Sequence, residues 1–220
     1  MRLVIFDVDG TIVDSAAHIV DTARFVFRKN DLPVPSDLDI RAIIGLSLEI
    51  AMQKLRPELD DAAAERLAQE YRDHFNHKIE IGSLEEQLYP GAIETIEKLG
   101  QQDETLLGIA TGKRLRGVER LFKEYGFGHH FQTLQTPDNN PSKPNPGMVL
   151  TAMSETGVDV AKTVMIGDTS YDMAMAKAAG AKALGVNWGY HDHSTLLESG
   201  ADLVIDHYHQ LIDAIDELTE

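Results

Sequence analysis

Short runs of consecutive apolar residues recur along the chain and predict strands that are buried on both faces. The first run is Leu3–Phe6, and four similar runs follow at Leu106–Ala110, Thr163–Ile166, Ala183–Val186 and Leu203–Ile205. Between and after the later runs, helical spacing recurs over Gly91–Gly100, Leu115–Tyr125, Gly147–Thr156, Tyr171–Ala179 and Tyr208–Leu218. Such alternation is typical of βαβ units, so the sequence predicts an α/β fold with a mostly parallel sheet flanked by helices.

Residues 15–88 break this alternation, and no convincing strand interrupts them. Their apolar residues recur three and four positions apart, as at Ile19, Ala23 and Val26, which predicts an all-helical insert. The turn-forming pair Pro90-Gly91 marks the return to the sheet. We therefore predict an α/β core formed by residues 1–14 and 89–220, and a helical insert formed by residues 15–88.

The position of the insert, directly after the first strand, suggests what it does. It can close over the carboxyl edge of the sheet, where open α/β sheets bind ligands. A lid over a binding site is the favoured interpretation, and the alternative is a helical domain that only enlarges the core.

The composition is that of an ordinary globular protein and excludes several kinds of chemistry. The 220 residues are 43% hydrophobic and 25% charged, so a substantial core can form without disulfides or metal staples. There is no cysteine, which rules out disulfides, thiolate zinc sites and cysteine nucleophiles. No basic and apolar leader opens the chain, and no apolar run approaches the roughly 18 residues of a membrane span. We therefore expect a cytoplasmic protein without a membrane partner.

The charge is strongly acidic, with 36 Asp and Glu against 20 Lys and Arg and a formal net charge of −16. Such a surface repels the phosphates of DNA and RNA, so we expect no nucleic-acid partner. It also repels small anions unless a cation reverses the local field. An acidic protein that handles a phosphorylated substrate is therefore expected to carry a divalent cation.

Candidate chemistry begins where the first strand ends, in Asp7-Val8-Asp9-Gly10-Thr11. Two carboxylates two residues apart project to the same side of an extended backbone. Like charges so close are costly unless a cation or a proton compensates them. The simpler alternative is a strand-ending turn, because Asp and Gly are common turn residues.

Two further segments offer groups that bind anions. Thr111-Gly112 ends the predicted strand Leu106–Ala110 just before a helix, and it presents a hydroxyl and free backbone N–H groups. Lys143 lies between prolines at 141, 144 and 146, which stiffen its loop and make it a positioned charge. Taken alone, Lys143 is better explained as a solvated surface lysine.

The last segment is Gly167-Asp168-Thr169-Ser170-Tyr171-Asp172, which closes another buried strand. Asp168 and Asp172 are four residues apart, at the start of the next predicted helix, and so lie near one another. Clustered hard oxygen ligands suit Mg²⁺, which takes one or two carboxylates together with phosphate oxygens.

The joint order of these segments resembles the haloacid dehalogenase-like hydrolase superfamily. The pattern is Asp-x-Asp-Gly-Thr after the first strand, Thr-Gly after a later one, a loop lysine, and then Gly-Asp-x-x-x-Asp. The resemblance covers nearly the whole chain, and Asp7 to Ser15 is similar to the phosphoglycolate phosphatase-like branch. It implies a Rossmann-like core, a small all-helical cap domain at residues 15–88, and Mg²⁺-dependent hydrolysis of a small phosphorylated metabolite.

The resemblance also implies roles for individual residues. Asp7 is then the nucleophile that forms an aspartyl-phosphate. Asp9 protonates the leaving oxygen and later takes a proton from water, and its backbone carbonyl is a metal ligand. Thr111 and the N–H of Gly112 hold the phosphoryl oxygens. The remaining roles fall to Lys143, which neutralises Asp7, to Asp168, which binds Mg²⁺ together with Asp7, and to Asp172, which supports the metal.

The sequence says less about the leaving group. Arg41, Gly45 and Ser47 stand where caps of this family lower a turn into the active site, and an ordinary helix junction is the alternative. The pairs His74/His77 and His191/His193 lack further ligands nearby, so we do not expect a histidine metal site.

Several functions remain open at this point. A phosphomonoesterase is favoured, with phosphoglycolate as the first candidate substrate. A pyrophosphatase or nucleotidase of the same superfamily is the alternative, and a sugar-phosphate mutase is a weaker one. A phospho-acceptor signalling module is a different class of protein, but receiver domains are much shorter and lack the Asp-x-Asp pair. The oligomeric state stays open between a monomer and a homodimer.

Overall fold

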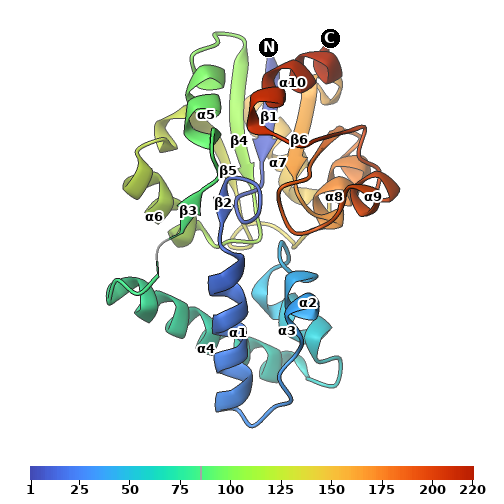
Figure 1. Cartoon of the computed structure of the whole chain (residues 1–220). Coiled ribbons are helices and arrows are strands. Elements are labelled where there is room, and N and C mark those ends of the chain that lie inside the picture. Colours follow the sequence, from blue (N-terminus) through green and yellow to red (C-terminus); the bar gives the residue numbers. More distant parts are fainter. Residues whose placement is uncertain (85) are drawn as a thin grey trace.

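A six-stranded sheet in which every strand is parallel to its neighbours forms the centre of the computed structural model, which describes residues 1–84 and 86–220 (Figure 1). The strands follow the order β5-β4-β1-β6-β7-β8. Their bounds are β1 (Arg2–Phe6), β4 (Thr105–Ala110), β5 (Phe131–Gln135), β6 (Thr163–Gly167), β7 (Lys182–Val186) and β8 (Leu203–Ile205). The predicted α/β fold is confirmed.

Helices cover both faces of this sheet, which explains the unbroken apolar run of β1. Val4 and Phe6 pack in the same cluster as α5 (Ala92–Gly100), α6 (Leu115–Tyr125) and α10 (Leu211–Thr219). Leu3 and Ile5 pack in the opposite cluster, with α7 (Gly147–Thr156), α8 (Ser170–Ala179) and α9 (His193–Glu198). Because successive side chains of a strand point to opposite faces, every residue of Leu3–Phe6 is completely buried.

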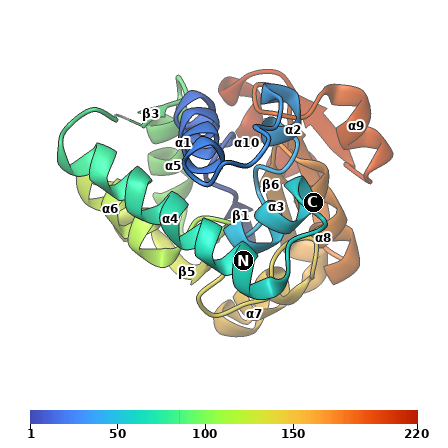
Figure 2. The same cartoon turned by 90° about the horizontal axis from the view of Figure 1, so that it is seen from below.

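The helical insert lies below the carboxyl edge of the sheet and buries a core of its own (Figures 1 and 2). It contains α1 (Ala16–Lys29), α2 (Asp37–Arg41), α3 (Leu48–Leu55) and α4 (Asp61–Glu80). Phe27, Ile40, Met52 and Leu67 come from these four helices and form one buried cluster. A unit with its own apolar core can lie against the sheet edge without sharing the core of the sheet.

Two very short strands connect the insert to the sheet. β2 (Val13–Asp14) enters the insert and β3 (Gln87–Leu88) leaves it, and the two pair in antiparallel fashion. The expectation that no strand interrupts residues 15–88 was therefore wrong at its last two positions. A two-residue strand has no periodicity that a sequence pattern could detect. The domain boundaries at residues 14 and 88 stay a prediction, and this two-stranded connection lies across them.

The sequence pattern also missed β5 and α9. β5 is an edge strand that carries Gln132, Thr133 and Gln135, so it lacks the continuous apolar run of the central strands. α9 has only six residues, too few for helical periodicity to emerge. The predicted helix Tyr208–Leu218 begins with the 3-10 turn Tyr208–Gln210 and continues as α10, and further 3-10 turns occupy Gly128–His130 and Val160–Lys162.

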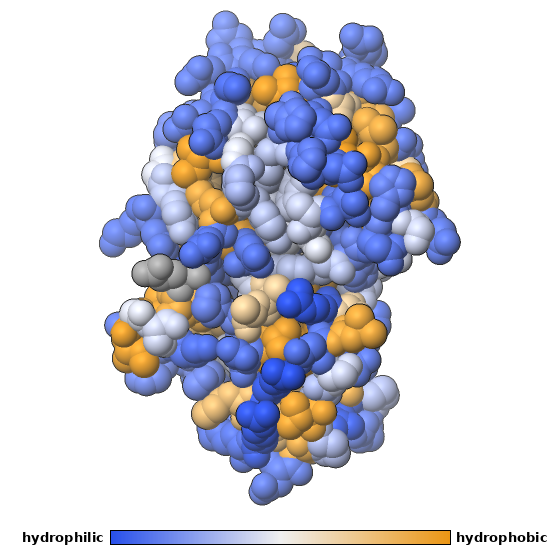
Figure 3. Space-filling view, in the orientation of Figure 1, coloured by the Kyte–Doolittle hydropathy of each residue, from blue (hydrophilic) through white to orange (hydrophobic). Residues whose placement is uncertain are grey.

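Hydrophilic side chains cover most of the face seen in Figure 3, as expected from the excess of acidic residues. Hydrophobic patches are visible on the helical insert and near the junction of the two parts. Within residues 1–84 and 86–220, none of the helices combines the length and apolar character required to cross a membrane.

Truncation of a β1 core side chain is expected to destabilise the protein strongly. Ile5→Ala leaves a cavity in the central strand and should lower the free energy of unfolding by about 2–5 kcal/mol. Leu38→Ala is the control, because Leu38 is 78% exposed on α2, and it should change that free energy by less than about 0.5 kcal/mol. Urea titration measures both, and equal effects would contradict the burial of β1.

Candidate active site

The residues singled out by the sequence meet at one edge of the sheet because three neighbouring strands end there. Asp7 follows β1, Thr111 follows β4, and Asp168 follows β6. β4, β1 and β6 are adjacent and parallel, so their carboxyl ends lie side by side. The pairing of β1 with β6 continues one residue beyond the end of β1, because the N–H of Asp7 donates to the carbonyl of Ile166 at 2.9 Å.

Asp7, Asp168 and Asp172 form a cluster of three buried carboxylates. One oxygen of each lies within 4.8 Å of the others. This is the only group of three or more potential metal-ligand side chains found among the described residues. The sequence predicted that Asp7 and Asp168 meet, and the structure brings them together.

Hydrogen bonds fix two of these carboxylates in direction. Asp168 accepts from the Thr11 hydroxyl at 2.9 Å and from the Tyr190 N–H at 2.9 Å. Asp172 accepts from the hydroxyl of Thr169 at 2.6 Å and from its N–H at 3.1 Å, in a capping box that starts α8. Asp172 is thus aimed back at the sheet edge by the N-terminus of its own helix.

Two glycines allow the backbone to close around Asp168. A Cβ on Gly10 would lie 2.1 Å from an Asp168 carboxylate oxygen, and a Cβ on Gly189 would lie 2.2 Å from the Asp168 Cβ. Gly10 also has a φ of +84°, which side-chain-bearing residues rarely adopt. No larger residue fits at either position without moving Asp168.

Lys143 is the cation of the cluster. Its Nζ lies 2.9 Å from Asp7 Oδ1 and 2.5 Å from Asp172 Oδ1, and its side chain is completely buried. Burial disfavours the ammonium form, but the charges of Asp172 and Asp7 outweigh burial and raise the pKa of Lys143. Lys143 is therefore a fixed charge rather than the solvated surface lysine that its sequence context also allowed.

The cluster holds more negative charge than Lys143 can balance. Burial raises the pKa of Asp7 to about 7, against the opposing effect of Lys143. Burial, followed by the charges of Asp172 and Asp7, raises the pKa of Asp168 well above its usual value. Asp7 Oδ2 is buried and has no hydrogen-bond partner among the described residues. These hard oxygens and the uncompensated charge fit a divalent cation such as Mg²⁺.

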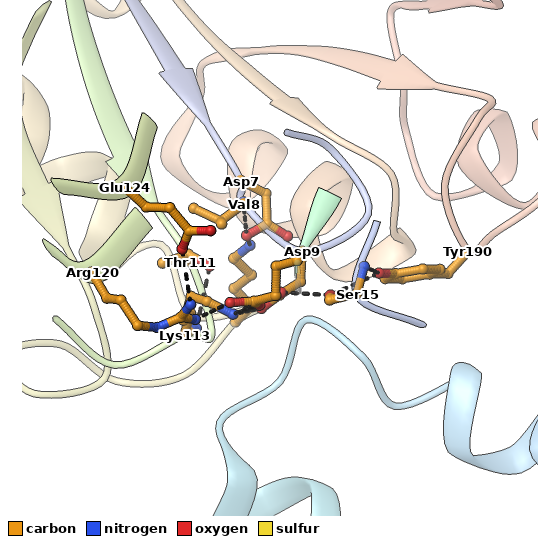
Figure 4. A network of polar contacts seen from close by, with 11 residues as sticks. Asp7, Val8, Asp9, Ser15, Thr111, Lys113, Arg120, Glu124 and Tyr190 are labelled. Carbon is orange, nitrogen blue, oxygen red and sulfur yellow. Dashed lines mark hydrogen bonds and ion pairs between the residues drawn. The ribbon is translucent and has the colours of Figure 1, made fainter. Parts of the chain in front are cut away.

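Asp9 lies outside this cluster, and its carboxylate lies between Lys113 and Ser15 (Figure 4). It accepts from the Ser15 hydroxyl at 2.6 Å and from Lys113 Nζ at 2.8 Å. Asp9 was predicted from the sequence, whereas Lys113 and Ser15 were given no role there. Lys113 directly follows Thr111-Gly112, and this adjacency is the only signal in the sequence that could have indicated it.

A cleft of about 1030 Å³ separates the sheet edge from the helical insert. Asp7, Asp9, Thr111 and Gly112 lie at its core side, and helix α4 lines its opposite wall. A substrate in this cleft would contact both parts of the chain.

The turn of the insert nearest the sheet contains two of the three predicted specificity residues. Gly45 and Ser47 line the cleft, whereas Arg41 is exposed at the end of α2 and is not part of the lining. Gly112 packs under this turn, because a Cβ on it would lie 2.6 Å from the carbonyl oxygen of Gly45. Ser47 donates its N–H to the Ser142 hydroxyl at 2.9 Å, next to Lys143.

The histidine pairs lie elsewhere. His74 stacks on Phe25 in the helical insert, with ring centroids 3.6 Å apart. His191 accepts a hydrogen bond from the Ser170 N–H at 3.0 Å. No histidine belongs to the metal-ligand cluster found among residues 1–84 and 86–220.

Known proteins are similar to this chain over most of its length. A family model described as haloacid dehalogenase-like hydrolase matches residues 4–186. A probable phosphatase, IndB, from Dickeya dadantii is 34% identical over 98% of this chain and 94% of its own. An N-acetylmuramic acid 6-phosphate phosphatase from Pseudomonas aeruginosa is 29% identical over 98% and 95%, and a phosphoglycolate phosphatase from Vibrio vulnificus is 28% identical over 98% and 96%.

A solved structure has the same fold. A hydrolase from Pseudomonas syringae superimposes with a TM-score of 0.87 at 25% identity and covers 100% of both chains. The similarity therefore includes the helical insert as well as the sheet.

We expect Mg²⁺ to stabilise the protein more at pH 8 than at pH 6. Because the pKa of Asp7 is raised to about 7, the folded protein without metal binds more protons than the unfolded chain at pH values between the ordinary pKa and the raised one. Its stability therefore falls as pH rises through that window, and below pH 7 protons compete with the cation. One pH unit below the raised pKa, this competition weakens apparent affinity about tenfold and removes about 1.4 kcal/mol of stabilisation.

Thermal unfolding with Mg²⁺ or with a chelator measures this effect. Asp168→Asn should abolish the Mg²⁺-dependent shift, whereas Asp202→Asn should keep it, because Asp202 pairs with Lys177 on the surface. A shift that persists in Asp168→Asn, or that is the same at both pH values, would contradict a cation held by this cluster.

Proposed function

Because the chain belongs to the haloacid dehalogenase-like hydrolase family and is a phosphoric monoester hydrolase, we propose that it is a Mg²⁺-dependent phosphatase that uses Asp7 as its nucleophile. The observation that carries this proposal is the buried cluster of Asp7, Asp168 and Asp172 with Lys143 against it. The proposed substrate is a small phosphorylated metabolite, because relatives of this chain are phosphatases of N-acetylmuramic acid 6-phosphate and of phosphoglycolate.

Asp7 is arranged for attack on phosphorus. Its Oδ1 is held by Lys143 at 2.9 Å and by the N–H of Val8 at 2.7 Å, so the side chain cannot rotate freely. Its Oδ2 has no partner among the described residues. A bond forms between phosphorus and a carboxylate oxygen of Asp7 while the bond between phosphorus and the leaving oxygen breaks, which gives an aspartyl-phosphate.

Asp9 moves the protons of the reaction. It lines the cleft beside Asp7, where it donates a proton to the leaving oxygen in the first step. In the second step it takes a proton from the water that attacks phosphorus. Inorganic phosphate then leaves, and Asp7 and Asp9 both return to their starting states.

The remaining residues bind the transferred group. The Thr111 hydroxyl, which hydrogen-bonds to Asp7 and accepts from the Lys113 N–H at 3.2 Å, and the Gly112 N–H would turn to the phosphoryl oxygens at the end of β4, just before α6. Mg²⁺ would be held by Asp7, the backbone carbonyl of Asp9 and Asp168, with Asp172 in support, and would supply positive charge to those oxygens. Phosphoryl transfer needs mainly positioning and charge stabilisation, which these groups provide.

Phosphoglycolate is the first substrate to test, since several relatives are phosphoglycolate phosphatases. The second is a sugar phosphate, since another relative is an N-acetylmuramic acid 6-phosphate phosphatase. The volume of the cleft, about 1030 Å³, is large for a two-carbon leaving group and favours including bulkier esters. Pyrophosphate, nucleoside monophosphates and sugar-phosphate isomerisation test the alternatives in the same screen.

Replacement of the two aspartates of the first motif should have different consequences. Asp7→Asn should abolish turnover, because the amide cannot form the acyl-phosphate. Asp9→Asn should lower kcat by about 10²–10⁴-fold, which is roughly 3–5 kcal/mol of barrier, because only proton transfer is lost.

Phosphate release over a panel of phosphorylated metabolites, with and without Mg²⁺, measures these losses and identifies the substrate class. The control is Asp14→Asn, a neighbouring exposed aspartate in β2, which should leave kcat within about twofold. Turnover that survives Asp7→Asn would refute the nucleophile, and single-turnover labelling without phosphate release would indicate a signalling module.

A further inference from the structure

Lys113 is a largely buried cation to which the proposed phosphatase mechanism assigns no role. Its side chain is 11% exposed, and its Nζ contacts both carboxylate oxygens of Asp9, at 2.8 and 3.1 Å (Figure 4). The same Nζ lies 2.9 Å from a carboxylate oxygen of Glu86. A lysine ammonium has three N–H donors, and these three contacts use all of them.

Glu86 anchors Lys113 from the segment that connects the insert to the sheet. It is completely buried, and it directly precedes β3. Its second carboxylate oxygen is paired with the guanidinium of Arg120. A guanidinium nitrogen of Arg120 also lies 3.5 Å from a carboxylate oxygen of Glu124, which is on the same helix. A buried carboxylate is costly unless it is paired, so Glu86, Lys113 and Arg120 hold one another in place.

The two connecting segments therefore both reach Asp9. Ser15, at the end of β2, donates its hydroxyl to Asp9 Oδ1 at 2.6 Å. Glu86, at the start of β3, reaches Asp9 through Lys113. Because β2 and β3 pair with each other, the direction of the Asp9 carboxylate depends on how this two-stranded connection is arranged.

We propose that Lys113 is a positioning residue for Asp9, held in place by Glu86, so that the connection between insert and sheet sets the direction of the proton-transferring group. This inference rests on the proposed role of Asp9 in proton transfer. Proton transfer requires a heavy-atom separation of about 2.6–3.2 Å, and a carboxylate free to rotate would meet that requirement less often.

The arrangement argues against the other use of a lysine in a phosphatase, which is direct contact with the phosphoryl group. Lys143 already occupies Oδ1 of Asp7, and no donor of Lys113 is left for a substrate oxygen. Binding a phosphate through Lys113 would break at least one of its contacts with Asp9 or Glu86.

The test is a double-mutant cycle between Lys113 and Asp9, with kcat measured on an alkyl phosphate, whose leaving oxygen needs a proton. Lys113→Met should lower kcat by about 10- to 100-fold in the native protein. In the Asp9→Asn background the same substitution should change kcat by less than about twofold, because the group through which it acts is already lost. Glu86→Gln should give a smaller loss in the same direction.

The leaving group provides a second readout that a merely structural role would not move. An aryl phosphate such as p-nitrophenyl phosphate leaves without much help from an acid. Lys113→Met should therefore lower kcat/KM on this substrate, which reports only the steps up to formation of the aspartyl-phosphate, by less than about threefold. Lys113→Arg, which keeps the charge, should recover part of the alkyl phosphate activity.

Controls separate failure of this inference from failure of the proposed function. Lys98→Met, an exposed lysine on α5, should leave both activities unchanged, and the melting temperature reports whether each variant is folded. If Lys113→Met costs as much in the Asp9→Asn background as alone, or lowers kcat/KM as much on aryl as on alkyl phosphate, Lys113 is not a positioning residue for Asp9. If Asp9→Asn itself spares alkyl phosphate hydrolysis, the proposed role of Asp9 fails first.

Discussion

Burial of three carboxylates beside a single lysine is the constraint on which the rest of the structure depends. Such a cluster is costly, because each ionised oxygen loses water and faces other negative charges. The cost is tolerable only if every group is held by a rigid element. Parallel strands β1 and β6 provide Asp7 and Asp168, the first turn of α8 provides Asp172, and the loop before α7 provides Lys143. The reactivity of Asp7 and the demand for a cation both follow from this enforced proximity.

The helical insert adds a second level of organisation, which acts on Asp9 rather than on the carboxylate cluster. Asp9 lies where the sheet, the insert and the connection between them meet. In a chain with a net charge of −16, the basic residues near Asp9, Lys113 and Arg120, are each paired with two carboxylates. In the proposed mechanism the cluster around Asp7 binds the phosphoryl group, and the connection to the insert positions the group that transfers protons.

Sequence patterns predicted the parts of this structure that depend on local order. The five apolar runs became the four central strands and the edge strand β8, and the residues that follow β1, β4 and β6 met at one edge because parallel strands must align their ends. The polar edge strand β5 and the two-residue strands β2 and β3 carry no comparable signal. Arg41 was placed near the cleft by its sequence position but lies outside it. The pairing of Lys113 with Glu86 depends on how distant segments fold together, so no local pattern could reveal it.

The two glycines that flank Asp168 have a consequence for how such an enzyme can diversify. Any side chain at Gly10 or Gly189 would collide with Asp168, so neither position accepts another residue while Asp168 keeps its place. The acidic cluster therefore has no room for stepwise adjustment, whereas the α4 wall of the cleft is built from side chains that can be exchanged one at a time. Substitutions in the α4 wall can therefore change which ester the protein accepts while the residues at the sheet edge stay the same.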